Sequence, residues 1–205
     1  MKLAIFGASG ATGRQLLRQA LDAGHTVSVL LRSADALPID HARLTRIVGQ
    51  LDHPATMRAV VQDAEAVICV LGARKGGAQN ICSDAMRHIL PAMQATGARR
   101  LIALSAYGAS ETYKASWFIR FVRKMIGAKM RDKDKMEALV RASATDWTLV
   151  RPPALTNGPS SGVYRSGTTL KPGIMGRISR ADLAAFMLRT AEQGNHLDQA
   201  PVVCT

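Results

Sequence analysis

Hydrophobic residues in this chain form short aliphatic runs, separated by longer stretches in which they recur every three or four positions. The runs are close to continuous rather than alternating, which is typical of strands buried on both faces of a parallel sheet. We expect strands over residues 2–6, 26–31, 44–48, 66–71, 100–105 and 146–150, and a short final strand over 201–204.

The stretches between these runs have helical spacing, and glycines end or break several of them. Helices are predicted over residues 11–23, 54–63, 78–96, 116–126, 132–143 and 180–192, with a glycine- and proline-rich stretch before the last one. Strands that alternate with helices predict an α/β fold, a doubly wound and mostly parallel sheet with helices on both faces. Ligands of such folds bind at the carboxyl ends of the strands.

Length and composition predict one ordinary globular domain. The 205 residues can build one core without disulfide or metal staples, so we expect a single domain over residues 1–205. No apolar run approaches the roughly 20 residues of a membrane-spanning helix, and no signal peptide is expected. Three widely spaced cysteines favour a reducing, cytoplasmic location, and five histidines without ligand spacing predict no metal site.

The chain is strongly basic. Lysine and arginine outnumber aspartate and glutamate by 27 to 15, which gives a net charge of +12. Such a protein attracts nucleotides, anionic membranes and other polyanions, or gains only solubility. No nucleic-acid-binding motif is present, so we expect no specific nucleic-acid partner. The oligomeric state stays open.

A glycine-rich loop, GASGATG, joins the first predicted strand to the first helix. Its first glycine allows a tight turn, its second lets the backbone approach a pyrophosphate, and its third lets helix and strand pack closely. The N–H groups at the start of the helix would bind the anion. The residues expected to bind a dinucleotide are Gly7, Ser9, Gly10, Ala11, Thr12 and Gly13.

The residue after the second strand selects the dinucleotide. An acidic residue there would accept a hydrogen bond from the ribose 2′-hydroxyl of NAD, but this chain has Arg32. A guanidinium binds a 2′-phosphate and stacks on adenine, so we predict NADP(H) as the cofactor. The alternative is that Arg32 is a solvated surface residue.

Further cofactor contacts are expected after the third and fourth strands. Gln50 and Leu51 follow the third strand and would flank the adenine. Small residues after the fourth strand would let the chain pass close under the cofactor ribose. The contacts predicted there are Leu71, Gly72, Ala73 and Arg74, of which Arg74 would face the phosphates or only be solvated.

Four strings resemble the atypical short-chain dehydrogenase/reductase superfamily: GASGATG, LSAYG after the fifth strand, DWTLVRPP at the sixth, and RISRAD before the last helix. Within that superfamily the chain is similar to the NAD(P)H-binding group that includes flavin reductase/biliverdin reductase B. The resemblance covers the whole chain. It implies a single-domain Rossmann fold, NADPH as hydride donor and a small aromatic acceptor.

The chain departs from the wider superfamily, because it has no Tyr-x-x-x-Lys pair: glutamate, tryptophan and threonine lie four positions after Tyr107, Tyr113 and Tyr164. Lys133 lies where the family lysine is expected, but the matching tyrosine position is Lys129. An alcohol dehydrogenase mechanism driven by a phenol is therefore not expected. The flavin reductase/biliverdin reductase group also lacks this tyrosine, which favours the narrower resemblance.

Ser105 and Lys133 are the candidate catalytic residues. Ser105 would orient the nicotinamide carboxamide or donate to the acceptor, or else only cap a turn. Lys133 would hold the nicotinamide ribose, or else be a solvated helix lysine paired with Glu137. The cofactor's nicotinamide end would be lined by Pro152, Pro153 and Ala154, which could instead only end the strand.

The substrate side is expected over residues 107–135 and 151–178, with Tyr107, Trp117 and Phe118 near the acceptor. Residues 114–131 form a basic amphipathic segment with three open interpretations: a lid, a packed outer helix, or a contact with an anionic membrane or partner. The sequence predicts an NADPH-dependent reductase of a conjugated acceptor such as a flavin, a quinone or a biliverdin-like molecule. The alternative is a non-catalytic NADP-binding redox sensor.

Overall fold

A computed structural model describes residues 1–73, 76–114, 117–173 and 175–205. Its main sheet has six parallel strands in the order β3-β2-β1-β4-β5-β6. These strands are β1 (Lys2–Phe6), β2 (Thr26–Leu31), β3 (Leu44–Val48), β4 (Ala66–Cys69), β5 (Arg100–Leu104) and β6 (Asp146–Val150). The chain reverses its direction of travel across the sheet between β1 and β4, which is where doubly wound folds bind ligands.

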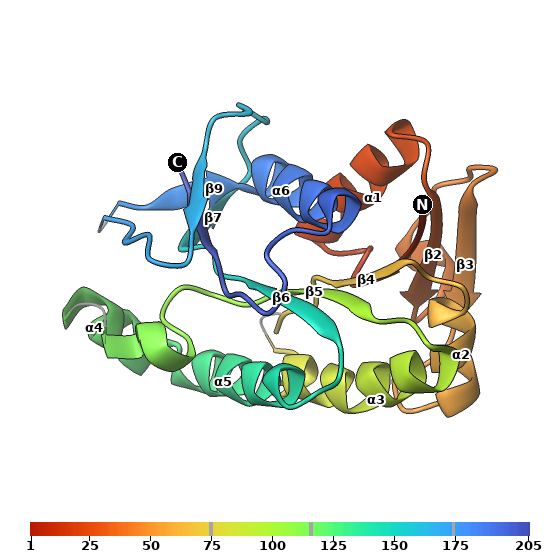
Figure 1. Cartoon of the computed structure of the whole chain (residues 1–205), viewed down its shortest axis with the longest axis horizontal. Coiled ribbons are helices and arrows are strands. Elements are labelled where there is room, and N and C mark those ends of the chain that lie inside the picture. Colours follow the sequence, from red (N-terminus) through yellow and green to blue (C-terminus); the bar gives the residue numbers. More distant parts are fainter. Residues whose placement is uncertain (74–75, 115–116, 174) are drawn as a thin grey trace.

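Helices cover both faces of this sheet (Figure 1). One face carries α1 (Ala11–Asp22) and α6 (Arg180–Gln193), and the other carries α2 (Pro54–Val61), α3 (Ile81–Thr96) and α5 (Gly127–Arg141). The predicted α/β fold is confirmed as a Rossmann-like domain.

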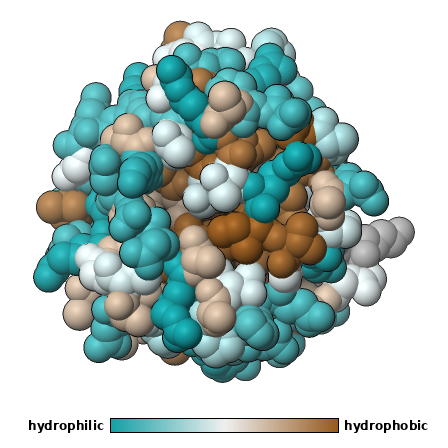
Figure 2. Space-filling model, turned by 90° about the vertical axis from the view of Figure 1, so that its right-hand side faces the viewer, coloured by the Kyte–Doolittle hydropathy of each residue, from teal (hydrophilic) through white to brown (hydrophobic). Residues whose placement is uncertain are grey.

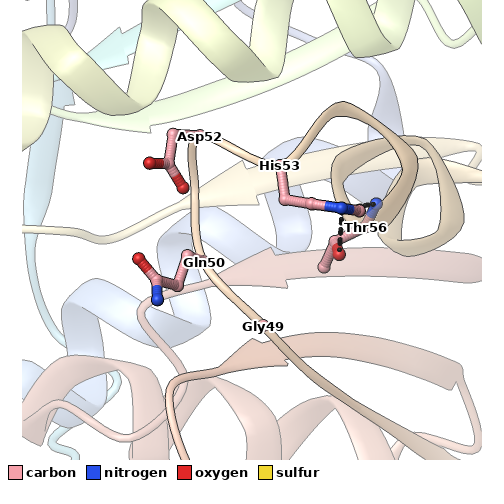
Figure 3. Close-up of a pocket in the computed structure, with 5 residues that line it drawn as sticks. All are labelled: Gly49, Gln50, Asp52, His53 and Thr56. Carbon is pink, nitrogen blue, oxygen red and sulfur yellow. Dashed lines mark hydrogen bonds between the residues drawn. The ribbon is translucent and has the colours of Figure 1, made fainter.

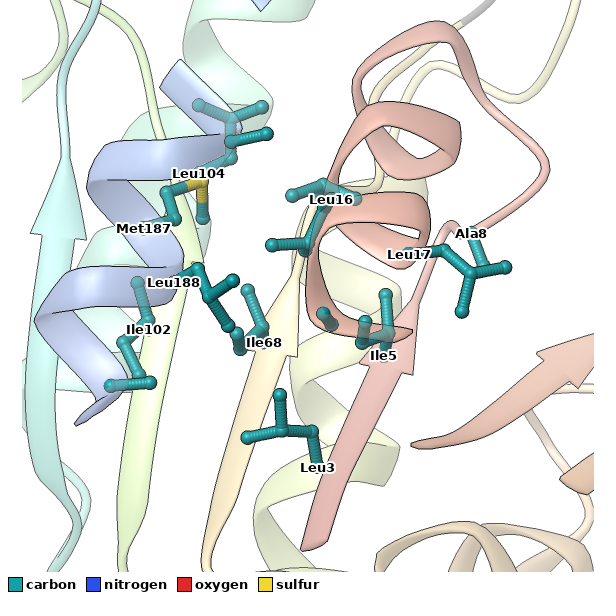
Figure 4. Packing of buried hydrophobic residues seen from close by; sticks show 14 of the residues in the cluster. Leu3, Ile5, Ala8, Leu16, Leu17, Ile68, Ile102, Leu104, Met187 and Leu188 are labelled. Atoms are coloured by element: carbon teal, nitrogen blue, oxygen red, sulfur yellow. The ribbon is translucent and has the colours of Figure 1, made fainter. Parts of the chain in front are cut away.

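Two apolar clusters form the core, one on each face of the sheet. They are separate because successive residues of a strand point to opposite faces. In Figure 4, Leu3, Ile5 and Ile68 from the sheet pack against side chains of α1 and α6. Phe6 belongs to the second cluster, on the face of α2, α3 and α5. The strands are continuous in aliphatic residues because both of their faces are buried.

Short strands also follow β6, in the part of the chain where the sequence predicted a glycine- and proline-rich stretch, a helix and a short final strand over residues 201–204. They are β7 (Ala154–Thr156), β8 (Arg165–Gly167), β9 (Arg177–Ser179) and β10 (Val202–Cys204). β7 pairs with β9, and β10 pairs with β8. Three-residue strands that contain arginine and glycine leave no apolar run in the sequence, so β7, β8 and β9 were missed.

Some helix boundaries differ from the predictions. The helix expected over 132–143 begins five residues earlier, at Gly127. Asp132 looks like an N-cap, but its carboxylate accepts from the N–H groups of Cys82 and Ser83, both at 2.9 Å, and so caps α3 instead. The basic segment contains η2 (Ser110–Lys114) and α4 (Trp117–Met125), and another short helical turn, η1 (Ala34–Ala36), follows β2.

The surface on the β3 side of the molecule is shown in Figure 2. Hydrophobic side chains gather near the middle of this face and hydrophilic ones surround them. Within the described residues, no helix is both long and apolar enough to cross a bilayer.

Candidate functional site

The loop between β1 and α1 leaves room for a ligand at one glycine only. Gly7 has a φ of +90°, and a Cβ there would lie 3.0 Å from the carbonyl carbon of Val70. A Cβ at Gly13 would lie 2.1 Å from the Gly7 oxygen, so this glycine lets α1 pack on β1. A Cβ at Gly10 would approach one described atom within 4 Å, the Gly7 oxygen at 3.3 Å. The space beside Gly10 would therefore let a ligand approach the backbone closely.

The start of α1 is open to an anion. Gly10 is the N-cap residue, no side chain of the described residues caps this helix, and its first turn has no acidic residue. The first N–H groups of a helix have no intrahelical acceptor and carry the positive end of its dipole. Ser9 and Ala11 lie at the surface, whereas Thr12 is buried. These groups fit the pyrophosphate of a dinucleotide.

Arg32 directly follows β2, next to this loop in the sheet order. Its side chain is exposed and has no hydrogen bond or ion pair within the described part of the chain. An unpaired guanidinium at this place is available to a phosphate group.

A hollow of about 390 Å³ lies after β3, lined by Gly49, Gln50, Asp52, His53 and Thr56. Figure 3 shows Gln50 and Asp52 on one side of the loop, and His53 and Thr56 on the other. The Thr56 hydroxyl lies 3.0 Å from His53 Nδ1, which also accepts from the Thr56 N–H and so caps α2. Leu51 is half-buried against the second core cluster.

Lys133 links the carboxyl ends of two strands. From α5, its Nζ donates to the Leu104 oxygen at 2.5 Å and to the Leu71 oxygen at 3.3 Å. The interpretation as a solvated lysine paired with Glu137 is therefore wrong, because the ammonium binds two carbonyl groups. An ammonium has three N–H donors, so one is left without a partner among the described residues. After Leu71, a Cβ at Gly72 would meet no described atom within 4 Å.

Ser105 is tied to a buried ion-pair network that the sequence analysis missed. Its Oγ donates to Glu137 Oε1 at 2.5 Å. Arg151, directly after β6, donates from Nε to the same oxygen at 2.9 Å and binds the other oxygen of Glu137 through a second nitrogen. The side chains of Glu137 and Arg151 are 0% and 2% exposed. Since the Ser105 hydroxyl donates its hydrogen bond to a carboxylate, its oxygen can accept a hydrogen bond from a ligand.

Glu111 closes this network at the surface. Arg151 donates to both Glu111 oxygens at 2.8 Å, and Arg141 donates to one of them at 3.0 Å. The hydrogen bonds from Arg151 lower the pKa of the Glu111 carboxyl to about 2, although burial opposes this shift. Glu111 therefore stays charged and anchors η2 to the end of β6.

Tyr107 and the proline segment lie next to each other at the ends of β5 and β6. The Tyr107 N–H donates to the Pro152 oxygen at 2.9 Å, and burial raises the pKa of the Tyr107 phenol. Pro152 is buried, Pro153 is half-buried, and Ala154 is exposed at the start of β7. The structure thus brings these residues to the same edge of the sheet as Ser105.

The structure gives less support to the aromatic residues expected near the acceptor. Trp117, at the start of α4, is 74% exposed, and the side chain of Phe118 lies outside the described residues, as does Arg74. A hollow of about 270 Å³ lies beside α4, lined by Tyr113, Arg120, Arg123 and Lys124.

Asp182, in the RISRAD string, has a structural role. Its carboxylate accepts from the hydroxyls of Ser160 and Ser179 at 2.7 and 2.8 Å, and from the N–H groups of Ser161 and Gly162, both at 2.9 Å. Burial raises the pKa of this carboxyl, but the hydrogen bonds outweigh burial and lower it to about 2. Asp182 therefore fastens the loop after β7 to the start of α6.

The chain matches the model of the NAD(P)H-binding family over residues 7–193 and belongs to that family. The match confirms the NAD(P)H-binding family that the sequence resembles. The photosystem II assembly factor Ycf39 of Synechocystis sp. is 30% identical over 115 residues. That match covers 54% of this chain but only 35% of Ycf39.

Two solved structures show the same fold. ChuY, an anaerobilin reductase of Escherichia coli O157:H7, has a TM-score of 0.86 at 22% identity, covering 99% of this chain and 96% of that one. A short-chain dehydrogenase/reductase of Veillonella parvula in complex with NADP has a TM-score of 0.81 at 20% identity, covering 98% and 93%. The chain thus has the fold of NAD(P)H-binding oxidoreductases.

Proposed function

We propose that this protein is an NADPH-dependent reductase of a conjugated acceptor. The observation that carries the proposal is the set of groups at one edge of the sheet. These are an uncapped helix start beside Gly10, the unpaired Arg32, and the polar pair Ser105 and Lys133. A neighbour solved with NADP and another described as a reductase support it.

The residues present fit the cofactor. The loop and the start of α1 would hold the pyrophosphate, Arg32 the 2′-phosphate, and the segments after β3 and β4 the adenine and ribose. Bound NADPH supplies a hydride. The contacts that we propose are Gly7, Ser9, Gly10, Ala11, Thr12, Gly13, Arg32, Gln50, Leu51, Leu71, Gly72, Ala73, Arg74, Ser105, Pro152, Pro153 and Ala154.

Ser105 and Lys133 would orient the nicotinamide end. Because Ser105 donates to Glu137, its oxygen would accept from the carboxamide rather than protonate the acceptor. The third N–H of Lys133 would bind a ribose hydroxyl, since the other two hold β4 and β5. Both residues would act by positioning.

The proposed acceptor class rests on the lack of a Tyr-x-x-x-Lys pair in the sequence and on the state of Tyr107 among the described residues. Reduction of a ketone produces an alkoxide that requires a proton donor, whereas a flavin, quinone or bilin spreads the added charge over a conjugated system. The phenol of Tyr107 is partly buried, and its raised pKa makes it a weaker acid. The residues of this chain therefore suit an acceptor that needs no protein acid.

The test is NADPH oxidation by the purified protein with a flavin, a quinone and a bilin in turn. We expect oxidation that depends on an acceptor and is lost in Gly10→Val, whose side chain would occupy the pyrophosphate position. Circular dichroism should show that this variant is folded. Tight NADPH binding with no acceptor reduced would contradict the proposal and favour the redox-sensor alternative.

A further inference from the structure

Three apolar side chains of helix α4 face away from the protein. Trp117, Phe121 and Met125 are four residues apart and lie on one face of the helix. Their exposed fractions are 74%, 55% and 72%. A helix packed on the protein through these three residues would bury their side chains, so packing does not account for this face of α4.

The other side of α4 faces the body. Arg123 donates to the Gly108 oxygen at 2.7 Å and to Asp134 of α5 at 3.1 Å. Ile119 also faces Gly108, because its Cγ2 would lie 3.1 Å from a Cβ built there. Figure 1 shows α4 at one end of the molecule, beyond the end of α5 and covering neither face of the sheet. The outward apolar face is therefore fixed by contacts on the opposite side.

Several cations around α4 have no carboxylate partner among the described residues. Residues 111–141 contain nine lysines and arginines and four acidic residues. Each acidic residue is engaged inside the fold: Glu111 and Glu137 with Arg151, Asp132 with the start of α3, and Asp134 with Arg123. Exposed cations that have no carboxylate partner in the described ranges remain at Arg120, Lys124, Lys129, Arg131 and Lys135.

We propose that α4 docks this protein onto an anionic lipid surface, lying in the plane of the interface. A helix with tryptophan and other apolar side chains on one face and cations beside them has the composition that binds such surfaces. The apolar side chains would enter the headgroup boundary, while Arg120 and Lys124 bind lipid phosphates.

Other occupants fit less well. A second copy of the chain would bring the same cluster of cations against itself, and like charges oppose such an interface. A nucleic acid would bind the cations and stack on Trp117. It would not bury the apolar side chains of Met125 and Ile126, of which Ile126 is 41% exposed. A lipid surface uses both the charge and the apolar face.

The experiment adds the cofactor-free protein to phosphatidylcholine vesicles, with and without one third phosphatidylglycerol. Trp147 is 7% exposed, so a change in tryptophan fluorescence on vesicle addition reports on Trp117. We expect co-sedimentation and a blue shift with the anionic vesicles only, both weakened by salt. No reductase activity is measured, so failure of this proposal leaves the proposed function untouched.

Matched variants separate docking from general charge. Arg120→Gln with Lys124→Gln should weaken vesicle binding about 20- to 30-fold, since each cation near an anionic surface contributes about fivefold. Phe121→Ser should weaken it at least about tenfold. The control is Arg18→Gln with Arg58→Gln, which removes the same charge from exposed sites on α1 and α2 and should change binding little.

Four results would overturn the proposal. Equal losses in the two double variants would mean non-specific attraction. Vesicle binding without a fluorescence shift would mean that α4 stays in water. A dimer that depends on Phe121, or nucleic-acid binding in place of vesicle binding, would assign the face to another occupant.

Discussion

At the scale of single residues, the three glycines of the first loop have different tasks. Gly7 permits a left-handed backbone, and Gly13 permits α1 to contact β1, so both serve the fold. Gly10 has the most room of the three, because a Cβ there would approach one described atom within 4 Å, the Gly7 oxygen at 3.3 Å. This position fits the close approach of a ligand to the backbone better than the other two.

Arg32 should decide the choice between NADPH and NADH. The guanidinium is exposed and unpaired within the described residues, so removing it breaks no internal contact. Loss of a charge-assisted bond to the 2′-phosphate costs roughly 1.5–3 kcal/mol, so Arg32→Ala should weaken NADPH binding about 10- to 100-fold and NADH binding little. Titration of both cofactors measures this, with Arg18→Ala as a control. A wild-type preference for NADH would rule out the assignment.

Ser105 should matter more to turnover than Tyr107. Ser105→Ala removes the hydroxyl that we propose as the carboxamide acceptor, whereas Tyr107→Phe removes a phenol that the proposed mechanism does not use. General acid catalysis contributes roughly 10²–10⁴ where it operates. We therefore expect Tyr107→Phe to lose less than about tenfold in kcat, and Ser105→Ala to lose more. Steady-state NADPH oxidation across pH tests this, and the reverse order would restore a tyrosine acid.

The sequence shows some site residues and hides others, for a physical reason. The glycine loop and Arg32 could be predicted, because their positions are set by one strand and the residues that follow it. Glu137 could not, because its partner Arg151 is 14 residues away and its place depends on how α5 packs on β6. Helical spacing suggested a pair with Lys133, but tertiary contacts gave both residues other partners.

At the scale of elements, one buried ion pair joins α5 to the end of β6, and Glu111 extends it to η2. This arrangement holds the end of β5, where Ser105 lies, against two neighbouring elements. The predicted strands of the main sheet and most helices were confirmed, because near-continuous aliphatic runs mark the strands and helical spacing marks the helices. The start of α5 was predicted five residues too late, and Asp132, the expected first residue, accepts hydrogen bonds from the start of α3.

Arg151→Met should be strongly destabilising. It would leave the carboxylate of Glu137 buried without its partner, which costs roughly 3–5 kcal/mol. The control is Arg141→Met, whose guanidinium binds Glu111 at the surface, lies over the Trp147 ring at 5.0 Å and is 4.0 Å from Glu137 Oε2. This control should cost about 1 kcal/mol or less. Urea unfolding of both variants measures the difference in the free energy of unfolding. Similar losses would mean that the buried ion pair contributes no more to stability than the exposed one.

At the scale of the whole molecule, carboxylates are scarce. Most of those near the carboxyl ends of the strands accept hydrogen bonds from other residues. The net charge of +12 means that protonating any of them adds to an existing excess of positive charge. Asp182 and Glu111 are both held charged by internal donors, so stability should depend on pH in the acid range.

Asp182 should make a contribution to stability that is lost between about pH 4 and pH 2. Its pKa is lowered from 3.8 to about 2 in the folded protein. A carboxyl with a lowered folded pKa stabilises the protein fully above its unfolded pKa and progressively less as the pH falls toward the folded value. Unfolding midpoints of wild type and Asp182→Asn should therefore differ most above pH 4 and converge toward pH 2. Asp35→Asn, at an exposed site, is the control and should follow wild type at every pH. A difference between wild type and Asp182→Asn that stays constant down to pH 2 would show that the ionised form of Asp182 is not what holds the loop.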